Sequence, residues 1–398
     1  MTTTVNNEHK KLNVPNLRFP EFQGEWVRMR LDAFTERVMR KNKNNKSKLP
    51  LTISAQYGLV DQITFFNKVI ASTDMSNYYL LKKGEFAYNK SYSSDYPWGA
   101  VKRLDNYEQG ALSSLYICFA PQDNVVSDFI LQYFESPKWH KGVSEIAVEG
   151  ARNHGLLNVS VQDFFHTYHY VPKDKKEQIK VAELLMLLDE RIATQNKIID
   201  KLQSLIKGIV DCTILRKEKN AIVGDVCSIS EQIRAEANID DIITVRLHGN
   251  GVCKSSAENL QLGATQYYRR RAGQLIYGKQ NFHNGAIGIV PISLDNGITS
   301  KDIPSFDIDE MKCNSVYLLA QLQSPQYYKP AEALTTGTGS KRLKEETFLK
   351  MPIVLPNKRE QDYIAVLIHR ASMKLDHAKN LLELLSIQKQ YLLRQMFI

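Results

Sequence analysis

The residues best suited to chemistry in this sequence are basic ones that gather in short clusters. One cluster occupies residues 37–48 and is interleaved with asparagines: Arg37, Arg40, Lys41, Lys43, Lys46 and Lys48. A second cluster follows a pair of tyrosines: Arg269, Arg270 and Arg271. Lysine and arginine neutralise phosphates, and arginine and asparagine can bind the guanine and adenine edges in the major groove. The clusters therefore predict binding of a polyanion such as DNA, with a solvated charged face as the alternative.

Two glycine-containing segments could add contacts to a phosphate backbone. The most glycine-rich loop is residues 335–342, and it does not satisfy the G-x-x-x-x-G-K-[ST] pattern of a nucleotide-hydrolysing phosphate loop. Its backbone amides, together with Lys341 and Arg342, could still hold a DNA phosphate. Residues 150–153 show the same order of residue types, which makes Arg152 and Asn153 candidates as well. A tight turn with solvated charges is the alternative for both segments.

No catalytic or metal-binding pattern stands out. No Asn or Asp precedes a Pro-Pro pair, which a base-methylating enzyme would use to clamp a flipped base. Residues 189–192 mimic the acidic box of a helicase but lie inside a heptad pattern, with no phosphate loop upstream. His166 and His169 have a metal-like spacing, but on the strand expected there they would face opposite sides. The five cysteines are scattered and contain no C-x-x-C pair, so we expect no metal and no catalysis in this chain.

The chain contains one internal repeat with a period near 185 residues. Residues 84–90 align with 273–279, with the glycine, tyrosine and lysine identical. Three further pairs of segments match in the same order: 136–137 with 324–325, 164–172 with 348–356, and 177–178 with 360–361. Lys90 and Lys279 occupy the same position behind a tyrosine, so we add them to the candidate DNA contacts.

Each repeat ends in a heptad pattern that predicts a long helix with one apolar seam. The first seam contains one polar residue, Gln195, and eight apolar ones: Val181, Leu185, Leu188, Ile192, Ile199, Leu202, Ile206 and Ile209. The second contains Lys389 and eight apolar ones: Ile364, Ile368, Ala371, Leu375, Ala378, Leu382, Leu385 and Leu392. A helix over 174–215 would be ~60 Å long, too long for one small domain to bury. We expect the two helices to pair antiparallel, with Gln195 near Ala378; two separate surface helices are the alternative.

Outside these helices the sequence has dense turn signals and short runs such as 159–161 and 285–291, which predict strands. The fold class expected is α+β, with two tandem domains joined by two long antiparallel coiled-coil helices in a pseudo-two-fold arrangement. The expected boundaries are as follows: a flexible tail at 1–15, domain 1 at 16–172, helix 1 at 173–218, domain 2 at 219–356, and helix 2 at 357–398.

Composition narrows the class of protein further. The 398 residues include 52 Lys and Arg against 43 Asp and Glu, a net charge of +9, which favours a polyanionic partner. The longest apolar run, 184–188, is far short of the ~20 residues that a membrane span needs. The polar N-terminus does not resemble a signal peptide, and the scattered cysteines indicate a reducing compartment. We therefore expect a cytoplasmic protein with no membrane partner.

These features together resemble the specificity (S) subunit of type I restriction–modification systems. The resemblance covers nearly the whole chain and rests on the order domain, helix, domain, helix. It also rests on the opening segment 15–26, which reads Pro-Asn-Leu-Arg-Phe-Pro-Glu-Phe-Gln-Gly-Glu-Trp, and on the proline and Glu-Gln that begin each helix.

The resemblance implies a non-catalytic chain in which two target-recognition domains each bind one half of a bipartite site on double-stranded DNA. The paired helices would fix the spacing of the halves and dock two methyltransferase subunits, which in turn bring two restriction/translocase subunits. S-adenosylmethionine, ATP and Mg²⁺ would belong to those partners, with no cofactor in this chain. The runner-up hypothesis is a coiled-coil structural adaptor whose two domains bind proteins.

Overall fold

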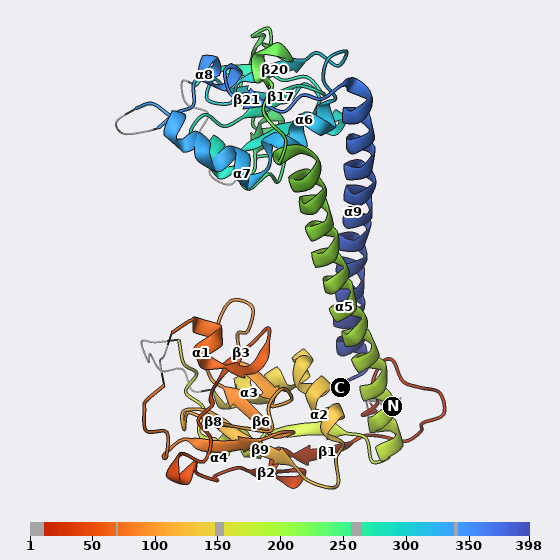
Figure 1. The fold of residues 1–398 in the computed structure, drawn as a ribbon. Coiled ribbons are helices and arrows are strands. Elements are labelled where there is room, and N and C mark those ends of the chain that lie inside the picture. The colour runs from red at the N-terminus through yellow and green to blue at the C-terminus, as the bar shows by residue number, and fades with distance from the viewer. Residues whose placement is uncertain (1–11, 69–70, 148–154, 256–264, 338–340) are drawn as a thin grey trace, which may run out of the picture. The chain divides into compact units, whose positions relative to one another are not determined.

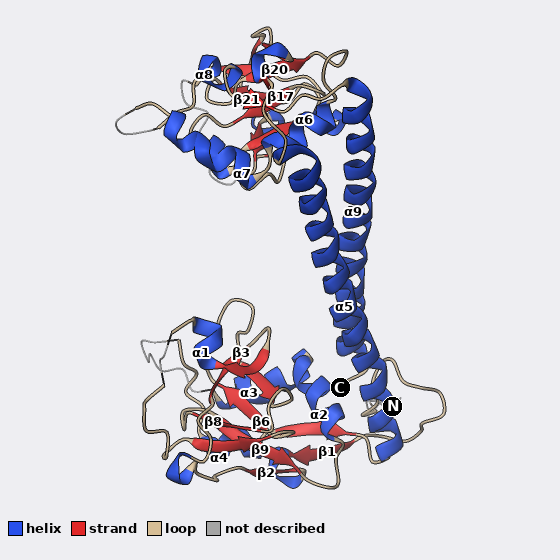
Figure 2. Ribbon diagram, in the orientation of Figure 1, coloured by secondary structure: helices blue, strands red, loops and turns tan. Residues whose placement is uncertain are grey.

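The computed structural model describes residues 12–68, 71–147, 155–255, 265–337 and 341–398 (Figure 1). It divides into two compact units. Unit 1 contains Met1–Thr194 and Leu382–Ile398, and unit 2 contains Gln195–Leu381. Each unit holds strands, short helices and part of two long helices, so the α+β class expected from the sequence is confirmed (Figure 2). Among the described residues, no helix is both long and apolar enough to cross a membrane.

The described residues of unit 1 form two four-stranded sheets and one two-stranded sheet. The first has the order β2-β9-β6-β7: Thr35–Arg37, Ile117–Pro121, Phe86–Asn89 and Ala100–Arg103. The second has the order β4-β3-β8-β5: Gly58–Asp61, Pro50–Ser54, Gln109–Leu112 and Tyr79–Lys82. The two-stranded sheet pairs β1 with β10: Val27–Arg30 and Tyr168–Val171. The short helices are α1 to α4: Gln62–Phe66, Ser127–Glu135, His140–Ile146 and Val161–His166.

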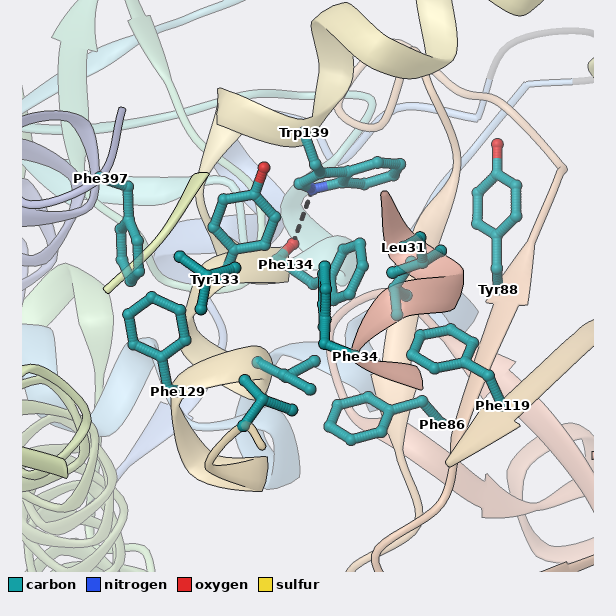
Figure 3. Close-up of a cluster of buried hydrophobic side chains, with 14 of the residues drawn as sticks. Leu31, Phe34, Phe86, Tyr88, Phe119, Phe129, Tyr133, Phe134, Trp139 and Phe397 are labelled. Carbon is teal, nitrogen blue, oxygen red and sulfur yellow. Dashed lines mark hydrogen bonds between the residues drawn. The ribbon is translucent and has the colours of Figure 1, made fainter. Parts of the chain in front are cut away.

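Aromatic side chains dominate the larger core of unit 1 (Figure 3). Phe86 stacks on Phe119, with ring centroids 5.3 Å apart, and the buried indole of Trp139 donates a hydrogen bond to the Phe134 carbonyl. Phe397, close to the end of the chain, packs edge-on or tilted against rings of α2. Because these large side chains come from distant segments, the core ties the first domain to the C-terminal segment within this unit.

Unit 2 repeats the main sheet of unit 1 with the same strand order. Its sheet β12-β20-β17-β18 is built from Cys227–Ile229, Ser305–Ile308, Leu275–Tyr277 and Ile287–Ile289. A three-stranded sheet has the order β13-β16-β19: Arg234–Ala235, Tyr267–Arg269 and Ile298–Ser300. Two strand pairs are also present in the described part of unit 2: β14 with β15 (Ile243–Val245, Val252–Lys254) and β11 with β21 (Ala221–Ile222, Pro352–Ile353). The short helices are α6 to α8: Ser315–Leu322, Pro325–Tyr328 and Glu345–Leu349.

The internal repeat predicted from the sequence is confirmed in the two cores. Tyr88 on β6 packs on Phe164, with ring centroids 4.6 Å apart, and Tyr277 on β17 packs on Phe348 at 4.7 Å. Both tyrosines are fully buried. The glycine that begins each repeated segment, Gly84 or Gly273, has a φ of +85° or +86°, which explains why that position is glycine in both copies. The tyrosine and the glycine therefore match between the repeats because the packing of the core and the backbone conformation require them.

The long helices are α5 (Lys175–Val210), which continues into a π-helical turn over Asp211–Leu215, and α9 (Lys358–Gln395). Each starts just after a proline and is capped by an acceptor side chain. The Lys176 N–H donates to Asp174 Oδ1 at 2.8 Å, and the Glu360 N–H donates to Asn357 Oδ1 at 3.0 Å. No predicted seam residue on either helix is exposed.

Antiparallel pairing of the helices is confirmed in both units. In unit 2, the buried Gln195 side chain donates from Nε2 to the Ala378 carbonyl at 2.9 Å, the neighbour expected from the seams. In unit 1, the other polar seam residue, Lys389, forms an ion pair with Asp189. Each polar residue of the seam thus has a partner on the opposite helix, as buried polar groups require. The alternative of two unrelated surface helices is wrong.

Some local predictions need correction. Residues 159–161, expected as a strand, include the start of α4, because the Ser160 hydroxyl accepts the Asp163 N–H and caps a helix there. The expected strand over 285–291 is present as β18. In the expected flexible tail 1–15, residues 1–11 lie outside the described part, but Asn13 is held by Trp26, whose N–H donates to its carbonyl at 2.8 Å.

Candidate nucleic-acid interface

The basic cluster of unit 1 lies on a loop that its asparagines make rigid. The buried side chain of Asn42 accepts the Ser47 N–H at 2.8 Å and donates to the Ser47 carbonyl at 2.9 Å. Between them, Asn44 and Asn45 adopt left-handed φ values of 57° and 50°, a conformation that asparagine tolerates better than most residues. The asparagines predicted to bind bases therefore include at least one whose amide is used inside the loop.

Four cations of this cluster extend outward from the loop or its neighbouring strands. The exposed residues without an ion pair within the described structure are Arg37, Lys43, Lys46 and Lys48. Unpaired exposed cations at this density produce a positive potential at the surface, since no acidic residue occurs between residues 37 and 48. This part of the predicted DNA-contact set is the strongest that the geometry offers.

The other two members of the cluster are bound to unit 1 itself. Arg40 donates to both carboxylate oxygens of Glu85 at 2.7 Å, and its side chain is only partly exposed. Lys41 donates to the Asn77 carbonyl at 2.8 Å, and its ammonium lies 4.3 Å from the centroid of the Tyr79 ring. These contacts attach the loop to the sheet that follows, so both residues position the loop.

The arginine run of unit 2 is divided between the interior and the surface. Arg270 is fully buried, and its guanidinium donates to Thr299 Oγ1 at 2.8 Å, Ser305 Oγ at 2.9 Å and the Ile303 carbonyl at 2.9 Å. Burial lowers the pKa of Arg270 to about 10, which still leaves it charged at neutral pH. Its prediction as a DNA contact needs correction, because the side chain that follows β16 turns into the unit and not toward solvent.

The two neighbours, Arg269 and Arg271, are exposed. They line a groove of about 440 Å³ that also contains Glu231, Asp307 and Glu310. The groove therefore carries more acidic than basic side chains. A polyanion approaching Arg269 and Arg271 would have to bind outside this groove, since the carboxylates repel phosphates.

The lysines that match between the repeats are both engaged within their own units. Lys90 donates from Nζ to the Val159 carbonyl at 3.4 Å. Lys279 lies 2.7 Å from a carboxylate oxygen of Glu345, with its side chain largely buried. Lys90, directly after β6, contacts the segment before α4, and Lys279, two residues after β17, contacts the first residue of α8. Their equivalence in sequence thus has a structural explanation.

The glycine-rich loops are described only in part. The backbones of Thr336 and Arg342 exchange two hydrogen bonds, of 3.0 and 2.9 Å, which close the loop at its base. Lys341 and Arg342 are exposed but lie 3.4 Å from Glu332 and 3.1 Å from Asp302, respectively. Residues 338–340 lie outside the described part of the chain. So do the candidates Arg152 and Asn153.

The histidine pair has no metal-binding geometry. His166 is the last residue of α4 and not part of a strand as expected, whereas His169 lies on β10. The His169 ring is within hydrogen-bond distance of the Tyr133 hydroxyl, at 2.8 Å, and of Thr167 Oγ1, at 2.7 Å. Burial lowers the pKa of His169 to about 3, so the ring is neutral. Within the residues described, no group of three or more potential ligands could hold a metal ion.

The Glu-Gln pair at the start of each long helix has a function that the sequence did not reveal. Gln178 accepts the Val126 N–H at 2.7 Å and donates to the Pro172 carbonyl at 2.8 Å. Gln361 makes the same two bonds in unit 2, with the Asn314 N–H at 2.9 Å and the Pro356 carbonyl at 2.8 Å.

Val126 and Asn314 are the N-cap residues of α2 and α6, so each glutamine joins a long helix to its domain. In unit 1 the preceding residue, Glu177, adds a bidentate ion pair with Arg18, at 2.7 and 2.8 Å, and accepts from the Trp26 indole at 3.0 Å. In unit 2, Glu360 pairs with Lys217. In the sequence, only the recurrence of the Glu-Gln pair in both repeats indicated that these residues have a shared structural role.

Comparisons with known proteins complete this description. No protein-family model matches the chain, and no curated protein matches it. Among solved structures, the S subunit of a type I restriction-modification system from M. genitalium is similar, with a TM-score of 0.60 and 13% identity, over 97% of this chain and 99% of that one. A chain from a structure described as "Structural basis underlying complex assembly and conformational transition of the type I R-M system" is similar, with a TM-score of 0.51 and 13% identity. That match covers 94% of this chain and 97% of the other. The fold of this chain is therefore that of a type I restriction–modification S subunit.

Proposed function

We propose that this chain is the DNA-recognition subunit of a type I restriction–modification complex, and that each unit binds one half of a bipartite DNA target. The observation that carries the proposal is the repetition of one domain fold on two antiparallel helices, in the fold of S subunits. A two-fold repeat suits a target with two half-sites, because each copy can present the same face to its own half.

The exposed cations support DNA as the ligand. The predicted contacts that are exposed and form no ion pair within the described residues include Arg37, Lys43, Lys46 and Lys48 in unit 1, and Arg269 and Arg271 in unit 2. Lysines would hold the phosphate backbone in a salt-dependent way, and arginines could also bind guanine edges. Binding of this kind orients the chain on the duplex without any reaction of its own.

The chemistry of the complex would belong to its partners. Two methyltransferase subunits would supply S-adenosylmethionine chemistry, and two restriction/translocase subunits would use ATP and Mg²⁺. Large apolar side chains are exposed along the outer faces of α5 and α9: Leu187, Ile198, Leu205, Leu384, Ile387 and Tyr391. Exposed apolar surface on a helix favours docking of another protein there.

The test is duplex binding by the chain co-expressed with a methyltransferase partner, followed by mapping of methylated sites in a genome that carries the pair. We expect a bipartite methylated sequence and an affinity that falls steeply as salt rises. Replacing Lys43, Lys46 and Lys48 by alanine should weaken binding to all sequences and reduce the salt slope by roughly one for each phosphate that is no longer neutralised.

Lys83→Ala is the matched control, because its ammonium already pairs with Glu108 on the surface of the same unit. A complex that binds proteins but shows no salt-dependent binding to duplex DNA would contradict the proposal. That result would favour the coiled-coil adaptor instead.

A further inference from the structure

Three aromatic rings are exposed together on unit 1. Tyr57, in the turn between β3 and β4, is 62% exposed, and Phe65 and Phe66 on α1 are 43% and 47% exposed. Their ring centroids are 6.3 Å apart for Tyr57 and Phe65 and 5.0 Å for Phe65 and Phe66, in edge-to-face contact. We call these three residues the aromatic tip; Figure 1 shows α1 and β3 at the margin of the unit.

The aromatic tip does not belong to the hydrophobic cores of its unit. Ile63, also on α1, adds a fourth exposed apolar side chain. Apolar surface of this kind is unfavourable in water, and contiguous exposed patches mark binding surfaces more often than scattered apolar residues do. The tip is therefore poised to contact something outside the chain.

Lysines lie close to α1 of the aromatic tip. Lys48 and Ile63 line the same cavity, of about 300 Å³, and the exposed Lys46 precedes it on the same loop. Between residues 37 and 68 the only acidic residue is Asp61. Asp61 is the N-cap of α1, where its carboxylate accepts from the Ile63 N–H at 3.0 Å and the Thr64 hydroxyl at 2.6 Å and keeps its negative charge.

The combination of aromatic rings and lysines favours a nucleic acid over a protein as the ligand of the tip. Lysine is depleted in protein–protein interfaces, whereas nucleic-acid interfaces are rich in positive charge. Aromatic rings can stack on bases, and apolar wedges can enter between base pairs and partly unstack them. We propose that the aromatic tip inserts against the bases of the duplex bound by unit 1, with Lys46 and Lys48 on the flanking phosphates. This inference rests on the proposed function and adds a base-contacting element to it.

The test uses the full chain in complex with its methyltransferase partner and duplexes that carry the mapped target. 2-Aminopurine, placed in turn at each position of both half-sites, reports unstacking by an increase in fluorescence. We expect the increase at one step of a single half-site, and its loss in Phe65→Ala/Phe66→Ala. The alanine variant should bind about 5- to 100-fold more weakly, with an unchanged salt slope.

Two control variants separate stacking from charge and from general surface effects. Lys48→Ala should reduce the salt slope by about one. Leu115→Ala removes another exposed apolar side chain of unit 1 and should change neither the affinity nor the fluorescence. Circular dichroism and tryptophan fluorescence of each variant should match the unmodified chain, because the rings lie outside the cores.

Equal DNA affinity of the ring variants and the unmodified complex would overturn the inference, even though the proposed function would stand. Loss of the methyltransferase partner in the ring variants, with DNA binding intact, would overturn it too and would assign the tip to a protein. Failure of the unmodified complex to bind duplex DNA would overturn both proposals.

Discussion

At the scale of single residues, several charged or polar groups owe their position to a complete set of hydrogen bonds. Within the described residues, Arg270 forms no ion pair, and neutral acceptors on β19, on β20 and in the segment between them bind its guanidinium. A buried charge is tolerated only with such compensation, because desolvation otherwise costs several kcal/mol. The same reasoning applies to His169, which stays neutral between two hydroxyl groups.

Arg270→Ala should destabilise unit 2 by about 3 kcal/mol, since it leaves a cavity and removes the donor that the buried hydroxyls of Thr299 and Ser305 accept from. All three tryptophans, Trp26, Trp98 and Trp139, lie in unit 1. In urea unfolding of this variant, the transition of unit 2 should therefore move to a lower urea concentration when circular dichroism is measured. The transition of unit 1, measured by tryptophan fluorescence, should not change. Arg269→Ala, the exposed neighbour, is the control and should affect DNA binding without lowering stability. Equal stabilities of the two variants would contradict the interior role.

Stability of unit 1 should fall in mild acid because of His169. Its folded pKa is about 3, below the unfolded value of ~6.5, so the unfolded state binds a proton that the folded state excludes. The loss begins as the pH falls through about 6.5 and amounts to about 2 kcal/mol between pH 7 and 5. Tryptophan-detected unfolding across this range measures it.

His169→Gln should flatten this acid dependence, whereas His166→Gln, at a more exposed position three residues earlier, should retain it. If the glutamine variant at position 169 kept the full slope, another group would be responsible.

At the scale of elements, each of the two long helices is attached to its domain by the same two hydrogen bonds of a glutamine side chain. In each repeat a fully buried glutamine accepts the N-cap N–H of a domain helix and donates to the carbonyl of the proline that precedes its own helix. Because both bonds are short and shielded from water, the direction of the helix is fixed relative to the domain of its unit. The polar seam residues Gln195 and Lys389 in addition bind partners on the opposite long helix, and these contacts fix how the two helices are aligned with each other.

Gln178→Ala and Gln361→Ala should each cost about 2 kcal/mol, in unit 1 and unit 2 respectively, because each leaves a partly buried N–H and a carbonyl without this hydrogen-bond partner. Tryptophan-detected urea unfolding should shift to lower urea for Gln178→Ala, while the shift for Gln361→Ala should appear by circular dichroism. Gln203→Ala on the exposed face of α5 is the matched control. A similarly small effect at all three positions would show that the glutamines do not anchor the helices.

At the scale of the whole molecule, the chain passes from one unit to the other twice, along α5 and along α9. The domains of the two units are connected only through these helices in the sequence. In the proposed function, the helical connection sets the separation of the two half-sites. Its length would then determine the spacer of the DNA target, independently of the bases that each domain binds.

Lengthening both helices by one heptad should lengthen the DNA spacer. Duplicating residues 196–202 and 371–377 preserves both seams and adds ~10.5 Å to each helix, about 3 base pairs of DNA. Methylation mapping should then show unchanged half-sites with a longer spacer. Duplicating only four residues in each helix rotates the seams out of register and should reduce assembly. Altered half-sites in the heptad variant would contradict the role of the helices as a ruler.

Periodic patterns in the sequence were enough to predict the repeat, the two helices and their antiparallel pairing, and turn signals with short runs predicted the α+β class. A heptad seam that cannot be buried in one domain requires a partner helix, and this requirement can be recognised without coordinates. The order of the strands could not be predicted in this way, because strand pairing depends on contacts between distant segments.

Which basic residues are available to a ligand became clear only from the packing of the folded chain. Arg40 and Arg270 read like their neighbours in the sequence, yet their partners lie 45 and 29 residues away. The aromatic tip was missed for the same reason, because the sequence does not show whether the rest of the chain covers Phe65 and Phe66. Whether a side chain is exposed depends on what the rest of the chain packs against it, and that information is not local.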